Sequence, residues 1–327
     1  MIERLRKPWP DHRAERTLGA VSLLIGVGVV AMIVFVVIRA WPIFQHNGLS
    51  WVLGGGDFET EVNKMTAATT NPPAAVFQLR AWPLIYGTVL SSGIAVVLGL
   101  AIAVLSSVFI VELAPARVSR VVIPMVRLLA SVPSVIYGLI GILVLVPFVG
   151  NHIITQHEKA SVQNVVQLTG AGLGVTVVIL TVMITPIMIA LICEALVSVP
   201  PSWREGAVAL GLNPLRAVLA VTVKAVRPAI VAALVLATAR ALGEAIMISM
   251  VSGSRSFAPR PSDGLVFFLE PLRTLASAIV DYHEGLGAPA LSSTLYAWAF
   301  VLLFSAFMLS VAGYLIKLPL RRYQTQG

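Results

Sequence analysis

The chain has 327 residues, of which 57% are apolar and only 12% charged, with a formal net charge of +8. Soluble domains carry about 25% charged residues, so this composition excludes a soluble enzyme and indicates an integral membrane protein. The basic residues flank apolar blocks and form no dense patch, which argues against nucleic acid as a partner and is typical of a protein oriented by a membrane.

Six apolar blocks are candidates for membrane-spanning helices. The first, 18–40, follows a polar and basic segment, 1–17, and is too long for the apolar core of a signal peptide. The others lie at about 83–111, 121–148, 171–193, 226–251 and 290–316. Each block can cross about 30 Å of hydrocarbon. The expected fold class is therefore an all-α integral membrane protein with six transmembrane helices.

The distribution of charge orients these helices. Lysine and arginine gather in the segments before, between and after the helices that would share one side of the membrane. They are Arg4, Arg6, Lys7, Arg13, Arg16, Arg117, Arg120, Arg204, Arg216, Lys224, Arg227, Lys317, Arg321 and Arg322. The positive-inside rule then predicts that both termini are cytoplasmic. Trp41, Trp51, Trp82 and Trp298 lie near the expected outer ends, where interfacial aromatic residues gather.

The same pattern predicts the organisation of the chain. A cytoplasmic basic tail, 1–17, precedes an accessory helix, 18–40, and an irregular external loop, 41–82, rich in glycine and proline. A five-helix core, 83–316, contains one long cytoplasmic loop, 194–225, and a cytoplasmic tail, 317–327, ends the chain.

The loop 194–225 predicts two short helices joined by a sharp corner. Pro200 and Pro201 end the preceding helix, and Ser202 with Glu205 has the spacing of a capping box for a helix over 203–210. Gly211 stands where a left-handed residue ends a helix. Asn213 can cap a second helix with Pro214 at its first position.

One face of the first short helix is apolar. Trp203, Ala207 and Leu210 share it, at positions i, i+4 and i+7. Two interpretations remain open from the residues alone. The helix lies on the lipid surface as an interfacial turn, or it docks into a partner protein.

Three motifs resemble a known family of transporters. Glu205-Gly206-Ala207, followed after three residues by Gly211, resembles the cytoplasmic loop of ABC importer permeases that docks into a cleft of the ATPase subunit. Lys224 departs from this pattern, since the family usually has proline there. Ser131–Gly138 and Arg240–Glu244 resemble the phosphate importer permease of the Pst type, specifically its C subunit.

This resemblance implies a function and a set of partners. It implies the core of a type I ABC importer permease in a bacterial plasma membrane, transporting inorganic phosphate and requiring no cofactor. The implied partners are a homologous permease subunit in a heterodimer, a cytoplasmic ABC ATPase dimer and an extracytoplasmic phosphate-binding protein. ATP hydrolysis would belong to the ATPase, because the chain contains no Gly-Lys dipeptide and hence no phosphate-binding loop for ATP.

Charged residues inside apolar blocks are the candidates for the transport pathway, because such residues are costly in a membrane. Arg240 and Glu244 have i, i+4 spacing on one predicted helix, so we expect that their side chains can meet. They would form either a structural ion pair or an anion-binding site. In the second case Arg240 would bind the anion, and Glu244 would weaken that binding enough for the anion to be released. Arg127 is a second anion contact or, alternatively, a side chain that snorkels to the cytoplasmic face.

The third block contains a second group of candidate residues. Pro133 and Ser134 are expected to kink its helix, and Gly138 and Gly141 to allow a close helix contact. Helix packing alone is a sufficient explanation for these residues.

Other functions remain as alternatives. The chain could be an ABC permease for sulfate, molybdate or an amino acid, an ion-coupled secondary transporter working alone, or a structural membrane scaffold. The lone Cys193 allows no internal disulfide and indicates no metal site.

Overall fold

The computed structural model describes residues 12–48, 50–53, 58–68, 74–77, 80–156, 158–159 and 167–321, and every regular element in these ranges is a helix. The longer helices are α1 (His12–Asn47), α4 (Trp82–Val108), α5 (Ala116–Ala130), α9 (Leu173–Val197), α13 (Arg227–Leu242) and α16 (Pro289–Arg321). The shorter α-helices are α2 (Ser50–Leu53), α3 (Phe58–Ala67), α6 (Ser134–Ile140), α7 (Val146–Phe148), α10 (Pro201–Ala209), α11 (Pro214–Ala217), α12 (Val223–Ala225), α14 (Ile246–Val251) and α15 (Leu275–Asp281). The 3-10 turns are η2 (Ala74–Phe77), η7 (Pro261–Phe268) and η8 (His283–Gly287), and the π-helical turns are η3 (Phe109–Leu113), η4 (Gly141–Leu145), η5 (Val149–Ile153) and η6 (Val218–Thr222).

Several of these helices meet the length and hydropathy needed to cross a membrane. Five continuous helical runs in the described part of the chain do so: Arg16–Asn47, Trp82–Leu113, Ser134–Ile153, Leu173–Val197 and Pro289–Leu318. A sixth crossing comes from Pro214–Ala225 together with Arg227–Leu242, a pair of helices bent by 63°. The expected all-α membrane fold is therefore confirmed, with one of its six spans bent.

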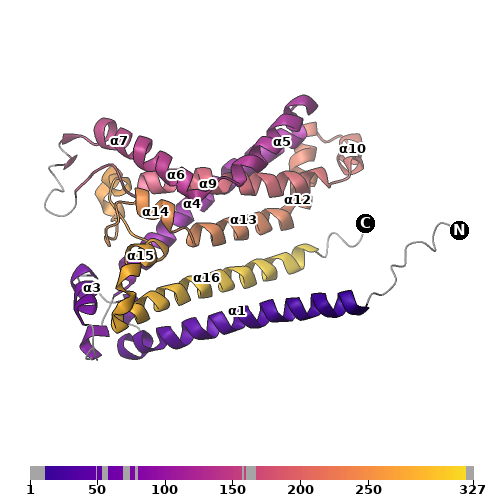
Figure 1. The fold of residues 1–327 in the computed structure, drawn as a ribbon. Helices are drawn as coiled ribbons and strands as arrows, with labels where there is room; N and C mark the ends of the chain where they lie inside the picture. The colour runs from indigo at the N-terminus through magenta and orange to yellow at the C-terminus, as the bar shows by residue number, and fades with distance from the viewer. Residues whose placement is uncertain are drawn as a thin grey trace.

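The ends of the helices are distributed over two sides. The start of α1, the end of α16 and the short helix α10 lie at the right-hand end of the molecule in Figure 1, whereas α3 and α15 lie at the opposite end. An even number of membrane crossings would bring the start of α1 and the end of α16 to the same side. The side on which the terminal helices begin and end is thus also the side of α10.

The predicted third span, 121–148, is wrong in its bounds. α5 ends at Ala130, and the apolar run that can cross the membrane begins only at Ser134. Pro133 is the N-cap of α6, with extended backbone angles, so it separates two helices where a kink within one helix was expected. α5 itself is too short to span and contains no buried residue.

The predicted fifth span, 226–251, is also interrupted. α13 ends at Leu242, and α14 begins only at Ile246. The 16 residues of α13 rise about 24 Å, because each helical residue advances about 1.5 Å. This falls short of the roughly 30 Å of a bilayer core, so an adjoining helix must complete the crossing.

The segment 41–82, expected to be external, is more ordered than its composition predicts. α1 continues to Asn47, and α3 forms within the segment, while Gly54–Gly56 and Pro72–Pro73 lie outside the described residues. Phe58 on α3 packs against Trp298 on α16, with their rings 5.9 Å apart. The segment therefore shares a small core with α15 and α16.

Two of the four tryptophans do not have the expected interfacial position. Trp51 and Trp298 are 1% and 0% exposed and belong to this small core. Trp41 and Trp82 are well exposed, as residues at a membrane interface are.

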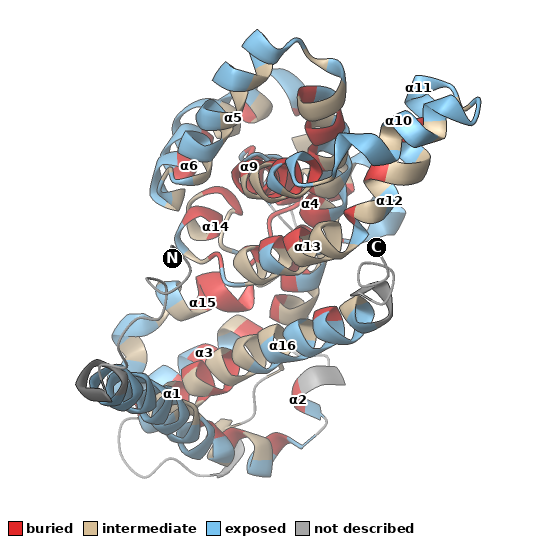
Figure 2. Cartoon of the chain, turned by 90° about the vertical axis from the view of Figure 1, so that its right-hand side faces the viewer, coloured by how far each residue is buried: buried red, intermediate tan, exposed pale blue. Residues whose placement is uncertain are grey.

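The main core is built around α9, the most buried of the five continuous spans (Figure 2). Small residues of α4 let it approach α9 closely: a side chain at Gly99 would meet the terminal methyl of Met188 at 2.8 Å. Thr181 Oγ1 also donates a hydrogen bond of 3.4 Å to the carbonyl of Ala95. This tight pair is the scaffold that carries the candidate site.

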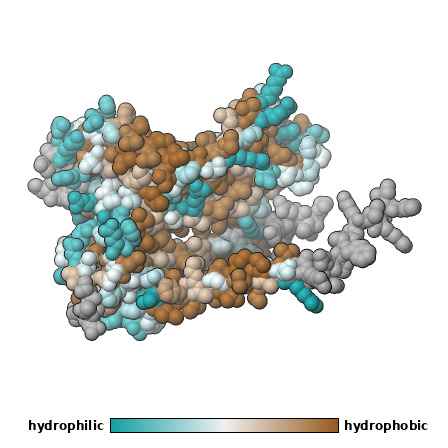
Figure 3. All heavy atoms as spheres, viewed as in Figure 1, coloured by the Kyte–Doolittle hydropathy of each residue, from teal (hydrophilic) through white to brown (hydrophobic). Residues whose placement is uncertain are grey.

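The outer surface is apolar where lipid would surround it. Leu23 and Leu24 on α1 are at least 70% exposed, and Figure 3 shows apolar residues over broad areas of the surface between polar ends. α1 packs along α16, which leaves most of α1 open to the bilayer.

Candidate functional site

The segment 201–217, called here the α10–α11 corner, has the predicted left-handed glycine. Gly211 adopts φ +90° directly after the end of α10. Its N–H donates to the carbonyl of Val208 at 2.9 Å, and the N–H of Leu212 donates to that of Ala207 at 3.2 Å. These are the two bonds of a Schellman motif, which is the standard glycine-dependent end of a helix.

The second helix of the corner also begins as predicted. Asn213 is the N-cap of α11, and its side-chain oxygen accepts the N–H of Leu215 at 3.0 Å. Pro214 occupies the first helical position, where a missing N–H has no cost.

The predicted capping box at the start of the corner is wrong. α10 begins at Pro201, two residues earlier than expected, with Pro200 as its N-cap and no side-chain cap bond. Ser202 therefore lies inside the first turn of the helix. Proline at the first position replaces the polar cap, because its ring removes one of the N–H groups that would need a partner.

Of the side chains on the predicted apolar face of α10, some contact the core and others are exposed to solvent. Trp203 lines a cavity of about 140 Å³ together with Val199 and Val226, at the junction of α9 and α13. Ala207 is half-buried, and Leu210 is 84% exposed at the corner. Glu205 and Gly206 are exposed as well. The corner thus holds to the core at one end and presents an apolar tip at the other.

An ion pair that the sequence did not reveal ties the corner to a membrane span. Arg204 on α10 contacts Glu112 in η3, the turn that ends the α4 run. The Glu112 side chain is only 6% exposed, whereas that of Arg204 is 39% exposed. Arg204 thus links α10 to the end of the α4 run.

The second group of predicted residues lies where α13 ends. Arg240 is in its last turn, Gly243 follows the helix, and Glu244 stands in the short break before α14. The break changes the predicted geometry, since the two charges are not on one continuous helix. Glu244 is 8% exposed, and its Oε1 accepts the N–H of Met247 at 3.2 Å. Both residues are described, and they form no ion pair with each other.

The motif Ser131–Gly138 is brought to this break. A side chain on Gly138 would lie 2.8 Å from the sulfur of Met250 and 3.2 Å from the Cα of Met247, so α6 and α14 touch at backbone distance. Pro133 and Ser134 begin the helix that carries this contact. The expected close packing at Gly138 is therefore present, and it joins two motifs about 100 residues apart in the chain.

Arg127 occupies a different place. It is exposed on α5. Among the described residues, no ion pair or hydrogen bond joins it to Arg240 or Glu244. Arg127 thus lies on α5, whereas Arg240 and Glu244 lie at the end of α13.

A buried arginine at the end of the molecule opposite α10 was not among the predicted site residues. Arg273 is 8% exposed and lies 3.1 Å from Asp281 and 3.2 Å from Glu59. It also donates to the Tyr282 hydroxyl at 2.5 Å, and that hydroxyl donates to Glu59 at 3.0 Å. Burial raises the pKa of Tyr282 to about 12, which keeps this donor protonated. Arg273, Glu59, Asp281 and Tyr282 are called here the outer arginine cluster.

Residues 95–316, which include both the α10–α11 corner and the break after α13, match the family described as the binding-protein-dependent transport system inner membrane component. The chain belongs to this family. It is therefore a multi-pass permease of the inner membrane and a transport component, whose ATPase is a separate subunit. Members of this family also work with an external substrate-binding protein.

Curated relatives of this permease carry transport names. It is 30% identical to the probable ABC transporter permease protein YqgH of Bacillus subtilis, covering 91% of this chain and 88% of that protein. It is 34% identical to the phosphate transport system permease protein PstC 1 of Mycobacterium tuberculosis, covering 74% of each chain.

Solved structures share the fold of this permease. The methionine ABC transporter MetNI in an inward-facing conformation has a TM-score of 0.52 at 18% identity, covering 73% of this chain and 94% of that chain. A bacterial ABC transporter that imports alginate has a TM-score of 0.50 at 16% identity, covering 95% and 99%. These likenesses agree with the expected fold of a type I importer permease.

Proposed function

We propose that this permease imports inorganic phosphate and forms half of the translocation pathway in a heterodimer with a homologous subunit. The observation that supports phosphate most directly is the similarity to proteins named phosphate permeases, which extends from 26% to 34% identity over most of the chain. An extracytoplasmic phosphate-binding protein would deliver the anion, and a cytoplasmic ATPase dimer would supply the energy.

Arg240 is the proposed anion contact in the pathway. A bare phosphate cannot enter hydrocarbon, so the pathway needs a positive group at membrane depth. The break at Gly243 supports this assignment, because irregular backbone at that depth is tolerated only inside protein or along a water-filled cavity. Glu244 is held at the break by the Met247 N–H, and we propose that its negative charge limits how firmly an anion is held there. Arg127 would act, if at all, as a separate contact nearer the end of α5.

The α10–α11 corner is the proposed docking element for the ATPase. Its proposed docking residues are Trp203, Glu205, Gly206, Ala207, Leu210 and Gly211. The exposed Leu210 would enter the cleft of the ATPase, while Arg204 and Trp203 hold the corner to the spans. In this orientation both termini are cytoplasmic, because they share the side of α10.

Uptake into vesicles tests the proposal as a whole. Membrane vesicles that contain the purified complex should accumulate labelled phosphate only when ATP is inside the vesicle, on the side of the membrane that α10 and the ATPase face. Sulfate and molybdate serve as competitors at equal concentration. Accumulation of one of them, without phosphate accumulation, would assign the permease to another substrate.

The docking assignment predicts the effect of Gly211→Asp. This variant should leave the protein in the membrane and lower ATP-driven uptake severely, because a side chain at φ +90° strains the corner and adds a charge at the interface. Pull-down of the ATPase and uptake measure the two effects. Gly264→Asp is the matched control: it has φ +63°, open space around it, and a position on the opposite side of the membrane. Equal losses in both variants would argue against docking at Gly211.

The topology predicts which engineered cysteines react from outside. The native Cys193 is only 2% exposed, so background labelling of the unmodified protein should be low. Thr60→Cys and Leu265→Cys should react with an impermeant maleimide applied outside, since both positions are exposed, and Leu210→Cys should react only after permeabilisation. The reverse labelling pattern would invert the orientation.

A further inference from the structure

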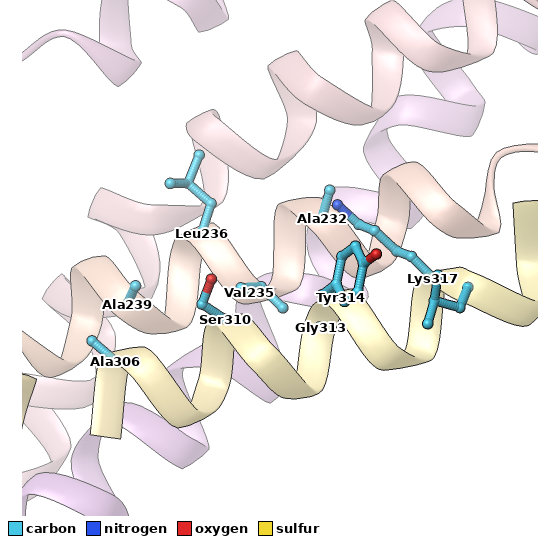
Figure 4. Close-up of a pocket in the computed structure, with 10 residues that line it drawn as sticks. Ala232, Val235, Leu236, Ala239, Ala306, Ser310, Gly313, Tyr314 and Lys317 are labelled. Carbon is cyan, nitrogen blue, oxygen red and sulfur yellow. The ribbon is translucent and has the colours of Figure 1, made fainter. Parts of the chain in front are cut away.

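A groove separates α13 and α16 along part of their length. It encloses about 400 Å³, and Figure 4 shows the residues on its two walls. They are Ala232, Val235, Leu236, Ala239, Ala306, Ser310, Gly313, Tyr314, Lys317 and Leu318. The helices approach closely where the absence of a side chain on Gly313 admits Val235. Around that point the small side chains leave the groove open.

The length of the groove matches one leaflet of a bilayer. From Ala306 to Lys317 the helix α16 rises about 16 Å, at about 1.5 Å per residue. Half of a hydrocarbon core is about 15 Å. The groove therefore extends from near the middle of the membrane to the level of the headgroups.

The headgroup end of the groove is cationic and has no acidic neighbour on either helix. The side chains of Tyr314 and Lys317 rise from α16 across the groove towards Ala232 (Figure 4). Neither α13 nor α16 contains an aspartate or a glutamate. Within the described residues, Lys317 forms no ion pair. Arg227 begins the antiparallel α13 at the same end. An anion would complement these charges.

We propose that this groove binds one acyl chain of an anionic phospholipid, whose phosphate contacts Lys317 and Tyr314. The bilayer is the surrounding solvent at this depth, so such lipids are always available to it. Basic pockets between transmembrane helices on the cytoplasmic side have the chemistry that anionic headgroups require. A protein segment in the same groove would have to place an acidic group beside Lys317. An anionic phospholipid already carries its negative charge at the headgroup level, where Lys317 lies.

Native mass spectrometry of the purified full-length chain with its associated subunits tests this site. The complex is loaded with phosphatidylglycerol or with phosphatidylcholine of identical acyl chains, and the retained lipids are counted. Lys317→Gln should lower retention of phosphatidylglycerol about fivefold, the effect of one lysine near a membrane surface, and should leave phosphatidylcholine nearly unchanged. Ala306→Phe should lower retention of both lipids, because the ring fills the acyl-chain end of the groove. Arg117→Gln, an exposed charge on α5 outside the groove, should change neither.

Three results would overturn the proposal. Unchanged retention in both groove variants would place the lipid elsewhere, and an equal loss in Arg117→Gln would indicate a general effect of surface charge. Efficient crosslinking of Ser310→Cys to another subunit would show that protein occupies the groove. Because every readout is lipid retention or crosslinking, failure of phosphate uptake would leave this test intact.

Discussion

Arg240→Gln is expected to lower ATP-driven phosphate uptake by about ten- to a hundredfold, while the protein still assembles and the ATPase still binds ATP. A hydrogen bond to a charged group contributes about 1.5–3 kcal/mol, and glutamine keeps the hydrogen-bonding capacity but not the charge. The expected loss follows because Arg240 is the proposed positive contact for the anion at membrane depth. Labelled uptake, together with the amount of assembled complex, measures it.

The break after α13 sharpens the test that uses Glu244. Glu244 accepts the Met247 N–H and does not pair with Arg240, so a purely structural role would act on α14 and not through the arginine. Glu244→Gln keeps an oxygen for that bond, whereas Glu244→Ala removes it. If Glu244 only caps α14, Glu244→Gln should transport normally and Glu244→Ala should be less stable.

The double variant Arg240→Gln with Glu244→Gln separates a pathway role from a structural one. It should be as impaired as Arg240→Gln alone despite normal assembly, because the positive group proposed to contact the anion at the break is missing. Recovery of uptake when both charges are neutralised would show that the two residues merely balance each other, and the pathway assignment of Arg240 would then be wrong.

Arg273→Met is expected to cause the largest loss of stability. It would leave Asp281, whose side chain is 17% exposed, without its charged partner and with only the Ser249 hydroxyl as a donor, and breaking a buried ion pair in this way costs about 3–5 kcal/mol. The contribution of Glu59 is smaller, since its side chain is 46% exposed and screened by solvent. The thermal stability of the detergent-solubilised protein measures the loss.

Arg80→Met is the matched control for this prediction. Arg80 lies 3.9 Å from Glu61 on α3, on the same side of the molecule, but its side chain is 42% exposed. A pair at the surface contributes only about 0–1 kcal/mol. A loss in Arg273→Met no greater than in Arg80→Met would mean that the outer arginine cluster does not stabilise the fold.

Features encoded by neighbouring residues were predictable from the sequence. The α10–α11 corner follows from Gly211, Asn213 and Pro214, whose effects depend on local backbone chemistry. The membrane spans follow from block length. The start of α10 was misplaced because Ser202 and Pro201 both favour a helix start, and sequence alone does not decide which residue takes the first position.

Features that depend on distant residues were not predictable. Glu59 and Arg273 are 214 residues apart, and Arg204 and Glu112 are 92 apart, so no spacing rule connects them. The break at Gly243 was missed because apolar residues continue on both sides of it. Hydropathy measures how apolar a segment is and does not detect where its helix stops.

At Val226 a bend of 63° joins the helical run Pro214–Ala225, which continues from the corner, to α13, so that the two runs form the arms of an angled lever. Arg227 and Arg240 are 13 residues apart, so this arm is about 20 Å long. A tilt of about 10° around Val226 would therefore shift Arg240 sideways by roughly 3 Å. That shift is comparable to the length of a hydrogen bond. A small rocking of the ATPase against the corner would therefore be enough to move Arg240 into contact with an anion or out of it.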